Sequence, residues 1–143
     1  MKAETNIGGL LGKSSRLLSN NFNHDMIQHN LTVEQWSLLA VLWSKDARKQ
    51  KNLQAELLKD KATISSLVSY LIKNGFVRKE RDSIDKRSFV IYLTSKGKSI
   101  KEITIPLAVH NIGKAIEGID TDELKTTMRV LTQIINNLTK EKS

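Results

Sequence analysis

The chain has 143 residues, of which 39% are hydrophobic, enough for one packed domain, either alone or with an oligomerisation element. It has a formal net charge of +8 and no cysteine, which excludes disulfides, thiolate metal sites and thiol redox sensing. No apolar run is long enough to span a membrane, and the N-terminus lacks the apolar region of a signal peptide. We therefore expect a cytoplasmic protein without membrane contact.

The positive charge is concentrated in the middle of the chain. Residues 45–101 contain fifteen basic and six acidic residues, a net charge of +9, whereas residues 1–44 sum to zero and residues 102–143 to −1. A compact cationic segment is typical of a surface that binds a polyanion. We predict that this segment binds nucleic acid, with an ordinary solvated basic face as the alternative.

Two helices are predicted before the basic segment. Apolar residues at helical spacing indicate a long amphipathic helix over residues 6–29. The capping-box sequence at residues 32–35, TVEQ, begins a second helix that continues to about Ser44. One face of this helix is expected to carry Trp36, Leu39, Ala40 and Trp43.

The basic segment has the pattern of a winged helix-turn-helix. A short helix at about 51–58, a turn at 59–61 and a second helix ending at Gly75 are followed by strands at 76–81 and 88–93. A brief strand is also possible in the connection at 45–51. The buried stripe of the second helix is expected to contain Ile64, Leu67, Val68, Leu71 and Ile72.

The exposed face of that second helix carries hydroxyl groups, one aromatic ring and cations, but no acid. Such a helix fits the major groove, where hydroxyl groups can bond to bases and phosphates, and a narrow basic hairpin can enter the minor groove. The candidate recognition residues are Lys61, Thr63, Ser65, Ser66, Ser69, Tyr70 and Lys73. The candidate wing residues are Arg81, Lys86 and Arg87. A merely solvated hydroxyl face is the alternative.

Two further helices are predicted after the hairpin. The first is capped by Thr94 or Ser95, and the second begins at the capping-box sequence at residues 120–123, DTDE. The last helix carries apolar residues at alternating spacings of four and three, which is typical of a narrow helix–helix seam. Together with the N-terminal helix, this seam predicts a subunit interface; packing within one subunit is the alternative.

The ordered motifs resemble those of the MarR family of bacterial transcriptional regulators over about residues 5–140. The motifs are LTVEQWSLL at 31–39, LIKNGFVRK at 71–79, DKR at 85–87 and YLTSKG at 92–97. The resemblance implies a mostly α fold with a small β-hairpin wing. It also implies a homodimer that binds a near-palindromic operator in double-stranded DNA, usually as a repressor relieved by a small molecule. We expect dimerisation helices at 1–30 and 95–143, and the DNA-binding domain at 31–94.

The resemblance also assigns roles to individual residues. It implies that Arg87 is the minor-groove arginine and that Asp85 braces the wing by ion pairing. Many relatives carry arginine where this chain has Ser66 and Tyr70, so bidentate reading of guanine is not available at these positions. We therefore expect specificity to depend on Tyr70, on hydroxyl contacts and on DNA shape.

The two tryptophans admit two interpretations. In the resembled family the effector pocket lies between the helix at 32–44 and the dimerisation helices, so Trp36 and Trp43 are candidate walls for a small apolar or aromatic ligand. A role in the hydrophobic core is the alternative. One branch of the family senses peroxide through a reactive cysteine. This chain has no cysteine, so it cannot use that chemistry.

Nothing in the sequence indicates an enzyme or a cofactor. The GxGxxG, GxxxxGK[ST] and HExxH motifs are absent, and His24, His29 and His110 lack the spacing of a metal site. We expect no enzymatic activity, no cofactor and no metal. The remaining alternative is a winged-helix module for protein–protein contacts, which would bind its partner without the steep salt dependence of DNA binding.

Overall fold

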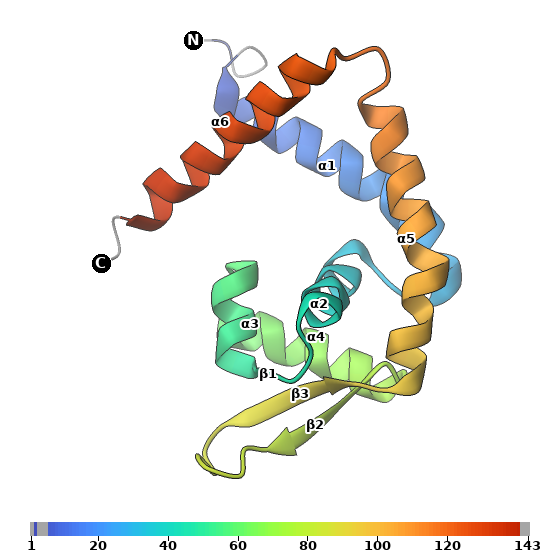
Figure 1. The fold of residues 1–143 in the computed structure, drawn as a ribbon, viewed down its shortest axis with the longest axis vertical. Coiled ribbons are helices and arrows are strands. Elements are labelled where there is room, and N and C mark those ends of the chain that lie inside the picture. The colour runs from blue at the N-terminus through green and yellow to red at the C-terminus, as the bar shows by residue number, and fades with distance from the viewer. Residues whose placement is uncertain (1, 3–5, 141–143) are drawn as a thin grey trace. The chain divides into compact units, whose positions relative to one another are not determined.

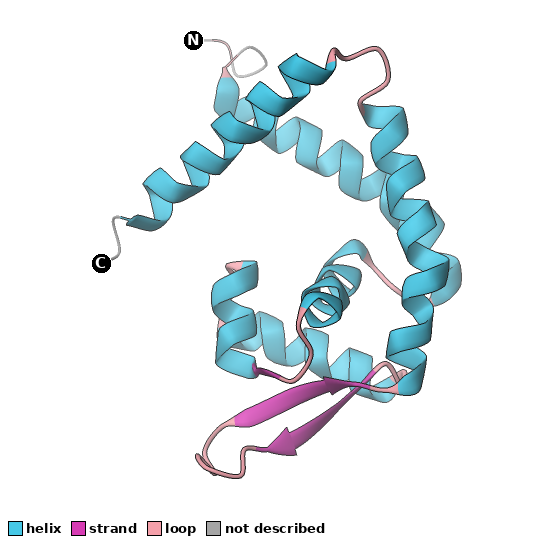
Figure 2. Cartoon of the chain, viewed as in Figure 1, coloured by secondary structure: helices cyan, strands magenta, loops and turns pink. Residues whose placement is uncertain are grey.

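The computed structural model describes residue 2 and residues 6–140, which are mostly helical with a small antiparallel sheet (Figure 1; Figure 2). This confirms the predicted fold class. The chain divides into two compact units, Met1–Asn111 and Ile112–Ser143. None of the described helices is long and apolar enough to cross a membrane.

The first unit begins with the two helices that the sequence predicts. Helix α1, Ile7–Met26, continues as the 3-10 helix η2, Ile27–His29, and ends at Asn30, whose φ of 61° is left-handed. Helix α2, Val33–Ser44, starts at a complete capping box. In this box the Gln35 N–H donates to Thr32 Oγ1 at 3.2 Å, and the Thr32 N–H donates to Gln35 Oε1 at 2.8 Å.

The helix-turn-helix consists of α3, Gln50–Leu57, and α4, Lys61–Lys73. Lys61, predicted in the turn, is the first residue of α4, because Asp60 caps this helix by accepting the Thr63 N–H at 2.8 Å. Gly75 follows α4 with a φ of 80°, as its predicted role in the helix end requires. The prediction that Ile72 belongs to the buried stripe was wrong. Its side chain is 40% exposed, because it lies about 100° around the helix from buried Leu71.

The wing is a three-stranded sheet in the order β1-β3-β2, with both pairs antiparallel. Strands β2, Val77–Arg81, and β3, Phe89–Leu93, form the predicted hairpin, each one residue shorter than expected. The brief strand in the preceding connection is β1, Arg48–Lys49, which pairs with the outer edge of β3. The wing is therefore attached to the start of α3 as well as to the end of α4.

The hydrophobic core lies within the first unit. It is formed by fifteen buried apolar residues: Phe22, Met26, Leu31, Leu38, Leu39, Leu42, Leu53, Ile64, Leu67, Val68, Leu71, Phe76, Val77, Ile91 and Leu93. The predicted face of α2 was incomplete, because Leu38 and Leu42 are fully buried whereas its two tryptophans are half-buried. This core holds α3, α4 and the base of the wing in a fixed relationship.

The remaining helices leave large apolar side chains exposed. Helix α5, Ser95–Ala115, follows the wing, and α6, Thr121–Lys140, lies in the second unit, where Asp120 caps it by accepting the Asp122 N–H at 3.0 Å. In α1 the exposed apolar residues are Ile7, Leu10, Leu11, Leu17 and Leu18; in α6 they are Met128, Ile135 and Leu138. These two faces are unpaired within their own units.

Candidate nucleic-acid interface

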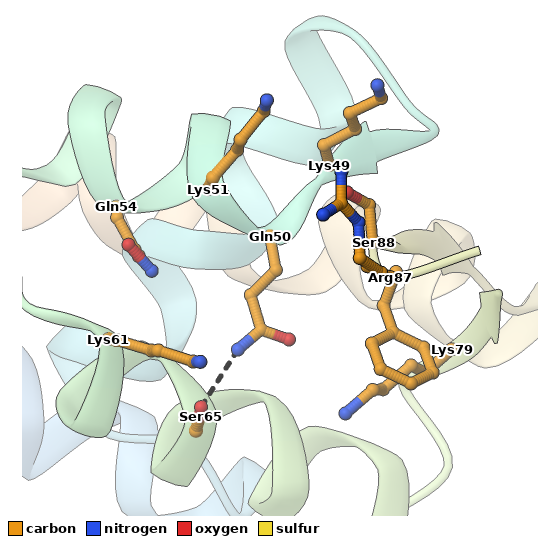
Figure 3. Close-up of a pocket in the computed structure, with 10 residues that line it drawn as sticks. Lys49, Gln50, Lys51, Gln54, Lys61, Ser65, Lys79, Arg87 and Ser88 are labelled. Atoms are coloured by element: carbon orange, nitrogen blue, oxygen red, sulfur yellow. Dashed lines mark hydrogen bonds between the residues drawn. The ribbon is translucent and has the colours of Figure 1, made fainter. Parts of the chain in front are cut away.

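A cationic pocket of about 360 Å³ lies between α3, α4 and the wing. Its lining consists of Lys49, Gln50, Lys51, Gln54, Lys61, Ser65, Lys79, Arg87, Ser88 and Phe89. Five of these side chains are cations, and none of the described residues in the lining is an acid. Figure 3 shows the amines and the guanidinium arranged around the opening, contributed by both helices and by the wing. Such an arrangement attracts a polyanion.

The two helices of the helix-turn-helix are linked at the floor of this pocket. Gln50, the first residue of α3, donates from Nε2 to Ser65 Oγ on α4 at 2.8 Å (Figure 3). The Gln50 Oε1 atom is buried and has no hydrogen-bond partner within the described chain.

The wing loop, residues 82–88, is held in one conformation by hydrogen bonds. The Asp82 N–H donates to the Ser88 carbonyl and the Ser88 N–H donates to the Asp85 carbonyl, both at 2.9 Å. Asp85 Oδ1 accepts the Arg87 backbone N–H at 3.1 Å and lies 3.4 Å from Arg87 Nε. Arg87 still has a 94% exposed side chain, so its guanidinium remains available to a ligand.

The carboxyl groups of this loop are held in their ionised form. The backbone N–H of Ile84 and the ammonium of Lys49 keep the pKa of Asp82 below its usual value. The backbone N–H of Arg87 and the hydroxyl of Ser88 do the same for the pKa of Asp85. Because hydrogen bonds to the charged form favour that form, both aspartates act as acceptors that shape the loop at neutral pH.

Cations on the wing strands stack on aromatic rings. Lys79 Nζ and the Arg81 guanidinium carbon lie 4.3 and 4.9 Å from the ring centroid of Phe89, and Arg78 lies 4.2 Å from that of Tyr92. Arg81 also donates to the Lys86 carbonyl. Ring stacking orders these cations and leaves their charge unchanged, but Arg78 is also paired with the Glu80 carboxylate.

The structure brings together only part of the predicted DNA-binding set. Lys61, Ser65 and Arg87 line the cationic pocket. The other predicted residues lie outside its lining: on α4, Ser66, Ser69 and Lys73 are exposed and Thr63 is half-buried, and on the wing Arg81 and Lys86 are exposed. Their contacts with DNA remain predictions.

Tyr70 has a contact that the sequence does not indicate. Its ring packs against the hydrophobic core, and its hydroxyl donates to the Asn30 carbonyl at 2.7 Å. This bond connects α4 to the left-handed turn before α2. In the free protein Tyr70 therefore joins two elements of the fold, and its predicted role in reading bases would require this bond to be exchanged for one to DNA.

Sequence reasoning missed seven residues of the pocket: Lys49, Gln50, Lys51, Gln54, Lys79, Ser88 and Phe89. Four of them lie in β1 and α3, which the sequence analysis treated as a connection and a supporting helix. The concentration of charge in residues 45–101 was the available signal. Assigning these residues required the pairing of β1 with β3, which brings the start of α3 beside the wing.

Both tryptophans of α2 bond to α5. The Trp36 indole N–H donates to Thr104 Oγ1 at 2.9 Å, and the Trp43 indole N–H donates to the Gly97 carbonyl at 2.8 Å. The two rings meet edge-on with centroids 5.7 Å apart. Trp43 also lines a separate hollow of about 300 Å³, together with Leu42, Asp46, Leu93, Lys98 and Lys101.

A helix-turn-helix and a β-hairpin that together carry a cationic surface define a winged-helix DNA-binding protein. The comparisons with known proteins specify the family. The family described as transcriptional regulator SarA/Rot matches residues 22–103. The chain is 30% identical to the regulator MgrA of Staphylococcus aureus over 117 residues, covering 80% of this chain and 78% of MgrA. It belongs to the SarA/Rot family of transcriptional regulators, and the predicted kinship with MarR regulators is confirmed.

Other relatives extend the similarity over almost the whole chain. The organic hydroperoxide resistance transcriptional regulator of Bacillus subtilis is 27% identical over 138 residues, covering 95% of this chain and 93% of that protein. A MarR protein from Peptoclostridium difficile has the same fold, with a TM-score of 0.89 and 24% identity over 99% of this chain and 94% of the other. CouR from Rhodococcus jostii, solved with p-coumaroyl-CoA, has a TM-score of 0.82 and 23% identity, with 94% of each chain covered. The family and fold are those of regulators rather than enzymes.

Proposed function

We propose that this transcriptional regulator binds its operator through the cationic pocket and the wing, as a homodimer in the cytoplasm. The observation that carries the proposal is the meeting of five cations from three elements around one opening without an acid in its described lining. Contacts with phosphates position such a protein on the duplex, whereas contacts with base edges specify the sequence.

Each element of the proposed interface has a distinct role. Helix α4 enters the major groove, where Ser65, Ser66 and Ser69 reach bases or phosphates. Lys49, Lys51 and Lys61 neutralise the phosphates beside that groove. Arg87, at the fixed wing loop, meets the enhanced negative potential of the minor groove. Lys86 and Lys79 add charge along the wing.

The dimer is inferred from the unpaired apolar faces of α1 and α6. Several large exposed apolar side chains on one helix are typical of an interaction surface, and a narrow apolar seam such as that of α6 suits helix–helix pairing. We infer dimerisation helices at 1–30 and 95–143. A symmetric pair would present two α4 helices to a near-palindromic operator, with half-sites about 34 Å apart.

We also propose that a small ligand releases the protein from its operator. CouR binds p-coumaroyl-CoA, and this chain has a hollow beside Trp43 at the junction of α2, β3 and α5. A ligand that favours a dimer with the wrong helix spacing would relieve repression. To shift the competent population from 99% to 1% requires about 5.5 kcal/mol of differential binding.

The proposal is tested by measuring DNA affinity as a function of salt, using duplexes selected by the protein from random sequence. We expect a steep fall in affinity with salt, and for Arg87→Ala a weaker complex whose logarithmic salt slope is smaller by about 0.9. The control is Lys114→Ala, which removes an exposed cation outside residues 45–101 and should leave both values unchanged. A salt-independent interaction would instead favour the protein-binding module.

A further inference from the structure

Ile84, at the tip of the wing loop, is 92% exposed, the highest value among the large hydrophobic residues that the structure describes. Isolated exposed hydrophobic residues are common on protein surfaces. Ile84 differs from such residues by its position. It lies in the loop between β2 and β3, two residues before Lys86 and three before Arg87. The formal charges of residues 82–88 sum to zero, but Lys86 and Arg87 are exposed, whereas Asp82 and Asp85 are half-buried and bonded within the loop or to Lys49. An isoleucine beside these two exposed cations is therefore suited to a partner that is anionic around an apolar surface.

The loop presents Ile84 in a fixed position. Its backbone N–H donates to Asp82 Oδ1 at 3.2 Å, and Asp82 is itself tied to Lys49 on β1 by an ion pair of 3.2 Å. Backbone hydrogen bonds from Asp82 to Ser88 and from Ser88 to Asp85 close the loop beneath Ile84. Because the backbone is ordered before binding, little conformational entropy is lost when the Ile84 side chain is buried.

We propose that Ile84 is an apolar contact to the minor groove, where it is inserted against the sugars or between two base pairs. This rests on the proposed function. Proteins that bind the minor groove insert isoleucine or leucine in this way and kink the duplex. Pyrimidine–purine steps are the easiest to deform. Ile84 therefore gives the wing a preference for a flexible step that Lys86 and Arg87, which respond to charge and groove width, do not provide.

The positive charge around Ile84 favours DNA over a protein as the partner that contacts this side chain. The described lining of the cationic pocket contains no acid, and both aspartates of the adjoining wing loop are engaged in bonds within the loop or to Lys49. A protein partner would have to cover this surface with carboxylates. A second copy of this chain would bring the same cations against it.

The test compares Ile84→Ser and Ile84→Leu with wild type on a duplex selected by the wild-type protein. Removing the buried side chain should weaken binding by at least tenfold, on the order of the transfer free energy of isoleucine. The salt slope should not change, because no phosphate contact is lost. Ile84→Leu should retain most of the affinity. Leu58→Ser, which alters another large hydrophobic residue that is 65% exposed and lies outside both the pocket lining and the inferred dimerisation helices, is the matched control and should bind like wild type.

A second measurement reports the insertion directly. A 2-aminopurine base placed at the minor-groove step should brighten when wild type unstacks it and stay dim with Ile84→Ser. Duplexes selected by Ile84→Ser should also lose the preference for a pyrimidine–purine step at that position. Unchanged affinity and unchanged selected sequences for Ile84→Ser would overturn the inference while leaving Arg87→Ala to test DNA binding separately.

Loss of the dimer in Ile84→Ser, measured by sedimentation, would assign Ile84 to a contact between copies and would also overturn the inference. Failure of the wild-type protein to select any duplex would instead refute the proposed function. Because the side chain is almost fully exposed, the melting temperature of Ile84→Ser should match that of wild type, so a folding defect would equally contradict the proposed geometry.

Discussion

Lys49 and Asp82 are joined by an ion pair in which Nζ lies 3.2 Å from Oδ2. The pair connects β1, a strand of two residues, to the loop at the far end of the β2–β3 hairpin (Figure 1). Lys49 also precedes α3 and lines the cationic pocket. One side chain thus fixes the wing loop relative to the helix-turn-helix and contributes charge to the proposed interface.

Replacing Lys49 by Met should therefore affect DNA binding in two ways. The variant loses one cation and also the bond that orients the loop, so its affinity should fall several-fold more than that of Lys51→Met. Lys51→Met is the matched control because Lys51 lines the same pocket. Equal affinities for the two variants, measured at one salt concentration, would show that the loop does not depend on this ion pair.

The pH dependence of the wing follows from its two aspartates. Both pKa values are lowered below 3.8 in the folded protein. The two ionised carboxylates therefore stabilise the folded state fully above that value, and this stabilisation is lost as the pH falls through the lower folded pKa values. We expect NMR signals of residues 82–88 to stay constant from pH 7 to about pH 5 and to change only at more acidic pH. In Lys49→Met the Asp82 pKa should rise toward its usual value, while that of Asp85, for which Lys49 is the smallest cause, should hardly change. A titration of the wing near neutral pH would contradict this assignment.

The sequence predicted the elements well because each has a local signal. The capping box at Thr32, the glycine after α4 and the period-two apolar residues of β3 depend on neighbours within a few positions. The predicted turn extends one residue too far, because Asp60 caps α4 and Lys61 is already helical. The domain limits stay a proposal, as does the pairing of the end helices.

The candidate site was harder to predict because it depends on contacts between distant segments. The pairing of Arg48 with Ile91 and of Lys49 with Val90 brings β1 and the start of α3 beside the wing, and no local pattern encodes it. Tyr70 looked like a surface residue from its helical position. Its bond to the Asn30 carbonyl, forty residues away, depends on how α4 packs against α2.

Tyr70→Phe separates the structural role of Tyr70 from the predicted role in reading DNA. The substitution keeps the ring and removes only the hydroxyl that bonds to Asn30. We expect the free energy of unfolding to fall by about 1 kcal/mol and the operator affinity to remain unchanged when measured well below the unfolding transition. Weaker DNA binding with unaltered stability would instead support direct contact between the hydroxyl and DNA.

Thr104→Val tests the bond between α2 and α5. Thr104 is fully buried, and the variant would leave the Trp36 indole N–H without its acceptor, at a cost of about 1–3 kcal/mol in unfolding free energy. Thr127→Val is the matched control, because the hydroxyl groups of Thr104 and Thr127 both donate to the carbonyl four residues earlier in their helices, whereas only Thr127 is exposed. It should cost far less. Similar losses in urea unfolding would mean that the indole bond contributes little.

Gly97→Ala should be the most damaging small substitution at the base of the wing. A Cβ atom at this position would lie 2.0 Å from the Phe76 carbonyl oxygen, which accepts the backbone N–H and the hydroxyl of Thr94 at 3.1 and 3.0 Å. Since backbone must move to admit the methyl group, we expect a loss of about 3 kcal/mol or more, which exceeds the helix-propensity gain of about 1 kcal/mol.

Gly113→Ala, in the same helix, is expected to increase the stability of the protein instead. Nothing lies within 4 Å of a Cβ built on Gly113, so the substitution should stabilise the protein by about 0.5–1 kcal/mol through helix propensity alone. Urea unfolding of both variants compares the steric cost at Gly97 with the gain in helix propensity at Gly113 for the same glycine-to-alanine change. If Gly97→Ala were as stable as Gly113→Ala, α5 would not approach Phe76 as closely as the structure requires, and the anchoring of the wing between α4 and α5 would have to be revised.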